Sequence, residues 1–318
     1  MTRIQNILVG VDLHHGDRLA SPMWGDESQA AVSEALLLAA KWEGTLTFCS
    51  VLEISSQSQS LIEHDRENIL KTVEDIASDV LTKLVSHANS LGIAAERIIR
   101  FGAAWEELSK ESANGQYDLV LIGTRSKNRA QSILFGSTAH KLMRFSPCPV
   151  WIVKPTELRE IREVAIATDL SPASQPAFRL AVTVARAIQA KLFVIHVLES
   201  SDLRYLSMAG VAEEQLARTE ERQRQAADAA IREQLHQTDF RTLPHGVMIE
   251  ILNGSADVAI PEFVARNEID LLVIGTHGRS GISSMLLGNT AERLLPGLHA
   301  SLLAVKPVDF QSPYAKAP

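Results

Sequence analysis

Three glycines in the second half of the chain have a spacing that can hold an anion. Gly275, Gly278 and Gly288 follow the pattern G-x2-G-x9-G, and Asn289 and Thr290 come next, at the start of an expected helix. Glycines let the backbone turn and approach a ligand closely, and the unpaired amide groups at a helix start favour an anion such as a phosphate. The pattern is neither a Walker loop nor the dinucleotide-binding fingerprint. Ordinary turn glycines would show the same spacing, so both interpretations stay open at this point.

Charged side chains near this loop suit a nucleotide. His277 and Arg279 lie inside the loop and can add positive charge. Asp169 closes the apolar segment VAIATD, as Asp12 closes the segment ILVGVD in the first half of the chain. A carboxylate at such a position can accept hydrogen bonds from a ribose hydroxyl or a base amino group. The alternative is that each aspartate caps the turn that follows it.

The segment that leads into the glycine loop occurs twice in the chain. Residues 117–124 read YDLVLIGT and residues 269–276 read IDLLVIGT, and Gly136 reappears as Gly288. A period this long indicates a duplicated domain rather than a solenoid. The two copies therefore provide an internal comparison, in which a difference in sequence can mark a difference in chemistry.

Each copy alternates apolar, strand-like segments with segments of helical periodicity. This alternation predicts an α/β fold, with two tandem doubly wound domains whose parallel sheets are covered by helices on both faces. Ligands in such folds bind beyond the carboxyl ends of the strands, where Asp169 and Gly275 are expected. The expected strands are 4–11, 45–51, 98–101, 118–122 and 149–153, then 164–167, 192–197, 247–252, 271–274 and 302–305. The expected helices are 27–42, 61–91, 105–113 and 137–144, then 173–188, 211–237, 258–266 and 290–295.

Composition and charge exclude several classes of function. The 318 residues are 46% hydrophobic and 22% charged, with a formal net charge of −7. A negative net charge argues against general binding to nucleic acid or to an anionic membrane. No apolar run approaches the roughly 18 residues of a transmembrane helix, so we expect no membrane insertion. Cys49 and Cys148 have neither metal nor redox spacing, and as two buried thiols they fit a reducing compartment such as the cytoplasm.

Metal and catalytic motifs are not expected. His14 and His15 are adjacent, and adjacent side chains rarely point at one ion, so we predict no metal site. No nucleophile elbow occurs in the sequence, and we assign no catalytic residue.

Several motifs together resemble the universal stress protein family, in its tandem form of two fused domains. They are the paired strand-end aspartates, the segment IGTHGRSGISSMLLGNTAERLL and the VKP that closes each copy. The resemblance covers about residues 1–155 and 160–307, which leaves 308–318 as a polar tail that we expect to be poorly ordered.

The resemblance implies a fold, a ligand and a set of site residues. The implied fold is Rossmann-like (adenine nucleotide alpha hydrolase-like), with five parallel strands in the order 3-2-1-4-5. Family members pair through the fifth strand, which here implies an intrachain pseudo-dimer or a homodimer. The implied role is a cytoplasmic stress-response module with ATP or another adenine nucleotide as ligand and with protein partners in signalling. The ATP-site residues carried over are Ala167, Thr168, Asp169, Val197, Gly275, His277, Gly278, Gly288, Asn289 and Thr290.

The two copies differ where the ligand would lie. Ser126 stands where the second glycine of the loop is expected, and a Cβ there penalises a positive φ and takes space. The loop after Asp12 is longer and carries Trp24, which could close over a ligand or fill the site. We therefore expect the first site to be degenerate or to bind something else, and its ligand stays unassigned. In the second copy Asn289 replaces the Ser or Thr of the family.

Three functions compete at this stage. The leading one is a nucleotide-binding stress-response module without efficient catalysis. The alternative is an ATP-independent scaffold or a carrier of a small, perhaps apolar, ligand, which Ser126, Asn289 and the Trp24 loop favour. The third is slow nucleotide hydrolysis, for which His277 is the nearby group suited to act as a base or phosphate contact.

Overall fold

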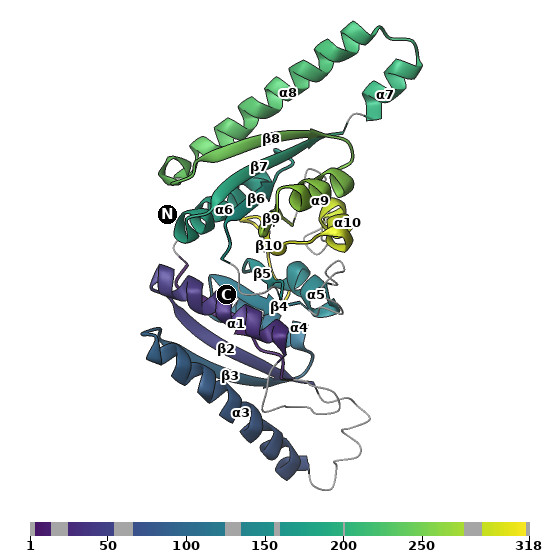
Figure 1. Ribbon diagram of the computed structural model, residues 1–318. Helices are drawn as coiled ribbons and strands as arrows, with labels where there is room; N and C mark the ends of the chain where they lie inside the picture. The colour runs from purple at the N-terminus through teal and green to yellow at the C-terminus, as the bar shows by residue number, and fades with distance from the viewer. Residues whose placement is uncertain are drawn as a thin grey trace. The chain divides into compact units, whose positions relative to one another are not determined.

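The chain forms two compact units, seen in the computed structural model (Figure 1). The structure describes residues 4–13, 25–53, 66–124, 135–155, 160–199, 201–276 and 288–315. The first unit comprises Arg3–Arg159 together with Phe310–Pro318, and the second comprises Glu160–Asp309 together with Met1–Thr2. The C-terminal segment of the chain therefore belongs to the unit built from the first half.

The first unit is built on a parallel sheet with the strand order β3-β2-β1-β4-β5. Its strands are β1 (Asn6–Gly10), β2 (Thr45–Leu52), β3 (Ala95–Phe101), β4 (Leu119–Gly123) and β5 (Val150–Val153). Its helices are α1 (Asp26–Trp42), α3 (Arg66–Ser90), α4 (Ala104–Asn114) and α5 (Ser137–Phe145).

The second unit repeats this topology, with the order β8-β7-β6-β9-β10. Its strands are β6 (Glu163–Ala167), β7 (Lys191–Leu198), β8 (Val247–Asn253), β9 (Leu271–Gly275) and β10 (Ser301–Val305). Its helices are α6 (Gln175–Ile188), α7 (Ser201–Met208), α8 (Glu213–His236), α9 (Ala256–Arg266) and α10 (Asn289–Leu294), with short 3-10 turns at Pro172–Ser174, Phe240–Thr242 and Leu295–Gly297. The predicted α/β fold with strand order 3-2-1-4-5 is thus confirmed in both units.

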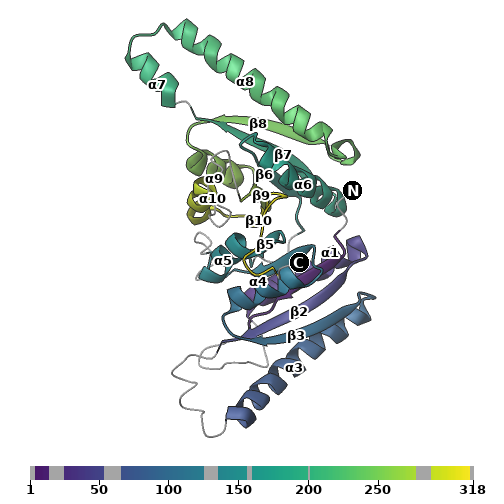
Figure 2. The same cartoon turned by 180° about the vertical axis from the view of Figure 1, so that it is seen from behind.

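Continuous apolar strands form the core of each unit. Ile7, Leu8 and Val9 are consecutive residues of β1 and are all fully buried, although neighbouring side chains of a strand point to opposite faces. Both faces of the sheet must therefore be covered, as is usual for parallel sheets. In the first unit α1 packs on β1 and β4 while α3 packs on β2 and β3 (Figure 2).

The end of α1 shows that a glycine can be required by space rather than by dihedral angle. Glu43, not Gly44, adopts the left-handed conformation that ends the helix, with a φ of 52°. A Cβ on Gly44 would lie 2.8 Å from the carbonyl oxygen of Gln5. The amide of Thr45 donates to that same carbonyl at 2.6 Å, so Gly44 lets the first residue of β2 approach the start of β1.

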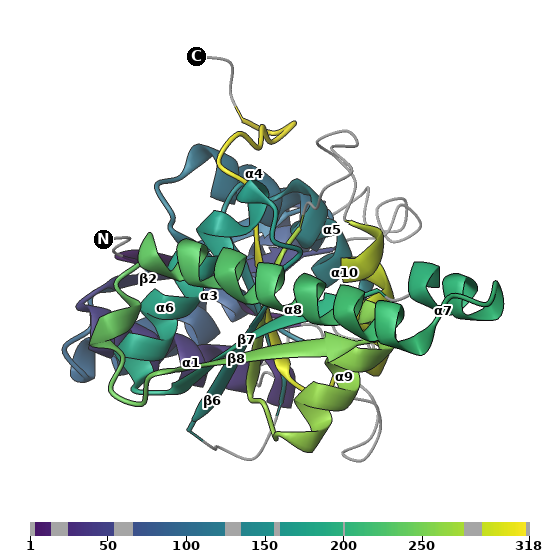
Figure 3. The same cartoon turned by 90° about the horizontal axis from the view of Figure 1, so that it is seen from above.

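A short helix, α7, precedes α8, and the sequence pattern, which predicts a helix over 211–237 alone, did not predict it. α7 ends at Met208, and Gly210 then adopts a φ of 86° before α8 begins. α8 lies along β7 and β8, and α7 continues beyond its N-terminal end (Figure 3). Tyr205 and Met208 of α7 are exposed, at 71% and 81%.

The C-terminal tail is packed on the first unit, in contrast to the poor order expected from its polar composition. The hydroxyl of Ser312 is part-buried and donates to the carbonyl of Phe145 at 2.8 Å, and the side-chain amide of Asn114 donates to the carbonyl of Tyr314 at 3.3 Å. The Tyr314 ring lies 6.2 Å from the Trp105 ring and 6.1 Å from the Phe145 ring, both in edge-on geometry. These aromatic contacts supply apolar burial that a short polar segment does not reveal in sequence.

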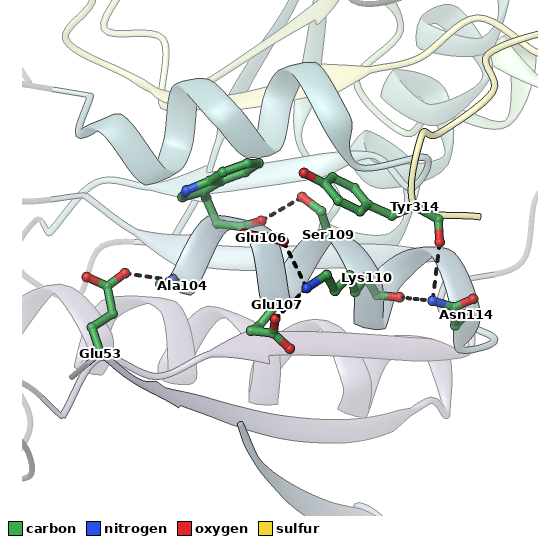
Figure 4. A network of polar contacts seen from close by, with 9 residues as sticks. Glu53, Ala104, Glu106, Glu107, Ser109, Lys110, Asn114 and Tyr314 are labelled. Carbon is green, nitrogen blue, oxygen red and sulfur yellow. Dashed lines mark hydrogen bonds and ion pairs between the residues drawn. The ribbon is translucent and has the colours of Figure 1, made fainter. Parts of the chain in front are cut away.

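Figure 4 shows the polar contacts of helix α4, among them the one from Asn114 to Tyr314 of the tail. The Glu53 carboxylate caps the start of α4, because it accepts a hydrogen bond from the backbone amide of Ala104 at 2.6 Å. Lys110 lies between Glu106 and Glu107, at 2.9 and 2.8 Å. Such solvent-exposed pairs each contribute little to stability.

Among the helices that the structure describes, none is long and apolar enough to cross a membrane.

Candidate functional site

The carboxyl ends of β6, β7 and β9 lie side by side in the second unit. Ala167, the last residue of β6, pairs with Ile195 of β7 on one side and with Ile274 of β9 on the other. Thr168 and Asp169 continue from β6, and Gly275 ends β9. The topology thus brings four of the predicted residues to neighbouring strand ends, and Val197 follows two positions beyond Ile195 on β7.

Asp169 organises the turn that follows β6. Its Oδ1 atom accepts hydrogen bonds from the backbone amide of Ser171 at 3.0 Å and from the Ser171 hydroxyl at 2.7 Å. Leu170, between them, adopts a left-handed φ of 65°, which is uncommon for a residue with a Cβ. The capping interpretation of Asp169 is therefore present in this structure, and it fixes the carboxylate at the strand end.

His196 ties β7 to the residue before this aspartate. It is 8% exposed, and its Nδ1 lies 2.9 Å from the carbonyl oxygen of Thr168. A carbonyl can only accept, so Nδ1 is the nitrogen that carries the hydrogen in this contact. His196 lies inside a strand, and its sequence position alone does not reveal this contact with the residue next to Asp169.

The two ends of the second glycine loop are closed by the backbone. Thr276 is almost fully buried, and its amide donates to Val305 of the neighbouring strand at 2.9 Å. Its carbonyl accepts from the amide of Gly288, also at 2.9 Å. A Cβ on Gly288 would lie 3.4 Å from that carbonyl oxygen, which is ordinary van der Waals contact.

The remaining predicted ATP-site residues of this loop are only partly described by the structure. His277, Gly278 and Arg279 lie outside the described residues. Asn289 is the first residue of α10, and Thr290 is exposed. The closure between Thr276 and Gly288 therefore places the two ends of the predicted cradle together, at the end of the strand next to Asp169.

The first unit has the same framework with different details. The amide of Thr124 donates to Val153 at 3.0 Å, as Thr276 does to Val305. Asp12 is held by α1, because its amide donates to the Ser28 hydroxyl at 2.9 Å and that hydroxyl donates to the Asp12 carbonyl at 3.2 Å. Ser126, Trp24, His14 and His15 lie outside the described residues, so the expected divergence of this site stays a prediction.

Titratable groups with shifted pKa values lie in the first unit. Burial raises the pKa of Glu34 on α1 to about 7, and its Oε1 atom is buried without a hydrogen-bond partner in the described structure. Burial also raises the pKa of the thiols of Cys49 and Cys148 to about 12. Both thiols are free and buried, as the sequence predicted. Within the described part of the chain, no three His, Cys, Asp or Glu side chains are grouped so that they could hold a metal.

A hollow of about 380 Å³ lies between α8 and the edge strand β8. Arg224 of α8 lines it and donates to the carbonyl of Ile251 on β8 at 2.8 Å. None of the predicted site residues lines this hollow, so it is separate from the strand ends that carry Asp169 and Gly275.

Comparison with known proteins places this fold in a family. A family model described as "Universal stress protein family" matches residues 3–154 and again residues 160–306. Universal stress protein E of Escherichia coli strain K12 is 25% identical over 330 residues, which cover 98% of this chain and 97% of that protein. Universal stress protein E of Photorhabdus laumondii is 24% identical over 326 residues, covering 100% and 99%.

Solved structures agree on the fold over both units. A putative universal stress protein from Pseudomonas aeruginosa matches with a TM-score of 0.66 at 22% identity, covering 96% of this chain and 95% of that one. A universal stress protein from Archaeoglobus fulgidus matches with a TM-score of 0.68 at 19% identity, covering 94% and 98%. Since the family model matches both halves and the relatives span nearly the whole chain, this chain belongs to the universal stress protein family, in its tandem form.

Proposed function

We propose that the second unit binds an adenine nucleotide, ATP above all, at the carboxyl ends of β6, β7 and β9. The observation that carries the proposal is the placement of the Asp169 carboxylate next to a strand whose glycine loop is closed between Thr276 and Gly288. Asp169 would accept a ribose or base hydrogen bond, with Ala167, Thr168 and Val197 around the base and ribose. The loop residues Gly275, His277, Gly278, Gly288, Asn289 and Thr290 would hold the phosphates.

The same proposal makes the chain a regulatory or signalling module of the stress response rather than an efficient catalyst. Phosphoryl transfer at useful rates depends on metal ions that bind the phosphates and on a positioned nucleophile. At the described strand ends of the second unit the candidate metal ligand is the Asp169 carboxylate, and it already accepts two hydrogen bonds from Ser171. A nucleotide held there would change the surface that a protein partner meets.

Two measurements on the purified full-length protein test this. Denaturation followed by chromatography identifies any adenine nucleotide that copurifies, and titration calorimetry measures binding of added ATP. We expect Asp169→Ala to weaken ATP binding and the matched first-unit variant Asp12→Ala to leave it unchanged. Absence of both a copurified nucleotide and a binding heat in the wild type would overturn the proposal in favour of an ATP-independent scaffold or carrier.

A further inference from the structure

A buried polar cluster lies directly beneath the turn that carries Asp169. Its members are Thr168, Ser171, Ser174 and Gln234, none more than 9% exposed. The first three belong to the turn after β6, whereas Gln234 comes from the last turn of α8, about sixty residues later in the chain. Burying such groups is costly unless each of them finds a hydrogen-bond partner.

The side-chain amide of Gln234 satisfies most of this cluster. Its Nε2 atom donates to the Ser171 carbonyl and to the Ser174 hydroxyl, both at 3.1 Å. Its Oε1 atom lies 3.4 Å from the Thr168 hydroxyl, whose single hydrogen is shared with the Ser174 hydroxyl at 3.2 Å. The Gln234 amide therefore contacts the turn on both sides of Asp169, at Thr168 before it and at Ser171 two positions after it.

The gripped turn has a conformation that needs external support. Leu170 has its left-handed φ of 65°, and its amide donates to the Thr168 hydroxyl at 3.0 Å. Ser171, whose carbonyl Gln234 holds, is also the residue that donates twice to the Asp169 carboxylate. Sparsely populated backbone conformations persist where surrounding contacts determine them. Here the turn is held by its own side chains, among them the Ser174 hydroxyl that donates to the Ser171 carbonyl at 2.7 Å, and by the Gln234 amide from α8.

The first unit shows that the fold itself does not require this cluster. The residue before Asp12 is Val11 rather than a threonine, and it is 3% exposed. Helix α3, which corresponds to α8, buries Leu84 at 3% exposure within its C-terminal half. In the first unit the Ser28 hydroxyl contacts the Asp12 backbone, whereas the unit with the more complete glycine loop keeps a four-residue polar cluster that is harder to satisfy.

We infer that Gln234 is a positioning residue for the nucleotide site, which it serves by fixing the turn and the carboxylate of Asp169 before the ligand arrives. The inference rests on the proposed function. A binding group held in advance loses less conformational freedom when the ligand binds. Removal of the Gln234 amide should therefore weaken nucleotide binding although Gln234 itself lies below the turn and does not line the site.

The first test is Gln234→Leu in the full chain, which exchanges the amide for an apolar side chain of similar size. We expect the Kd for ATP to rise about tenfold, the equivalent of one lost buried hydrogen-bonding set, with the circular dichroism spectrum unchanged. Gln223→Leu, at an exposed position of the same helix, is the matched control and should leave the Kd unchanged.

The second test separates positioning from a general loss of packing. In Gln234→Glu a neutral carboxylic acid can still donate to the Ser171 carbonyl, whereas a carboxylate can only accept and would repel it. The ratio of the variant Kd to the wild-type Kd should therefore fall as the pH is lowered from 8 to 5.5, and division by the wild type removes the titration of ATP and of every group that the two proteins share.

The outcomes are distinguishable. A folded Gln234→Leu protein that binds ATP within twofold of the wild type overturns the inference and leaves the proposed function standing. Should Gln234→Leu not fold, a pH-independent Kd ratio for Gln234→Glu overturns it instead. A wild type that binds no nucleotide overturns the proposed function, and the inference with it.

Discussion

The hydroxyl of Ser312 donates a hydrogen bond to the carbonyl of Phe145 at 2.8 Å, across 167 residues of sequence. Phe145 is the last residue of α5, the helix that follows the first-unit glycine loop. A helix end leaves carbonyl groups without intrahelical partners, and the tail supplies one of the missing donors. The C-terminal residues are therefore part of the structure of the first unit.

The first prediction concerns the ring of Tyr314. Tyr314→Ala should lower the free energy of unfolding of the first unit by about 1–2 kcal/mol, because it removes two edge-on aromatic contacts and their buried area. Urea unfolding followed by tryptophan fluorescence is a suitable measurement, since Trp105 is one of the two partners. Gln311→Ala, at an exposed tail position, should leave the curve unchanged. Coincident curves for Tyr314→Ala and the wild type would contradict the packed tail.

The second prediction concerns the second glycine of the nucleotide loop. Gly278→Val should abolish ATP binding while the fold survives, because a branched side chain takes the space of a phosphate and restricts the backbone. Titration calorimetry and circular dichroism measure the two effects. Ser126→Val, at the corresponding position of the first copy, is the control. Equal ATP affinity in Gly278→Val and the wild type would remove the assignment of this loop.

The third prediction is a dependence of stability on pH that comes from Glu34. Its folded pKa of about 7 is raised above the ordinary value of 4.5, so the folded state favours the protonated carboxyl. This contribution is complete below pH 4.5 and is lost as the pH rises through 7. With 1.36 kcal/mol for each pKa unit, it amounts to at most about 3 kcal/mol.

Glu34→Gln tests this dependence. Urea unfolding at several pH values should show the wild type losing stability between pH 4.5 and 7 relative to this variant. The exposed Glu74→Gln should follow the wild type. Parallel stability profiles for Glu34→Gln and the wild type would mean that the carboxylate is solvated.

The fourth prediction concerns the two thiols. Because burial raises the pKa of Cys49 and Cys148 to about 12, neither should form the reactive thiolate at neutral pH. We expect a thiol reagent such as Ellman's reagent to react slowly with the native protein. In urea, where the chain is unfolded, it should react rapidly with both thiols. Rapid labelling of one thiol under native conditions would show that its part of the core opens readily.

The order of elements could be predicted because parallel strands buried on both faces leave continuous apolar segments in the sequence. The same reasoning predicts Asp169 and Gly275 at neighbouring strand ends, since each closes such a segment. Gln234 could not be found in this way. It lies in a strongly charged helix, where its composition suggests a solvated face, and its burial depends on contacts with Ser171 and Ser174.

Helix α7 and the packed tail were not predicted, for a related reason. The predicted helix 211–237 corresponds to α8. Nothing in the residues before Gly210 distinguishes the helix α7 from a loop. In the tail, Ser312 and Tyr314 stand among polar residues without any period. Their positions follow from surfaces offered by α4 and α5, which local sequence does not describe.

The packed tail also bears on how the protein is made. Ser312 and Tyr314 follow the second unit in the chain, so the first unit leaves the ribosome without them and acquires them only after the second unit has been synthesised. A first half expressed alone would lack these contacts. The two units therefore do not fold independently one after the other, because residues that follow the second unit complete the first.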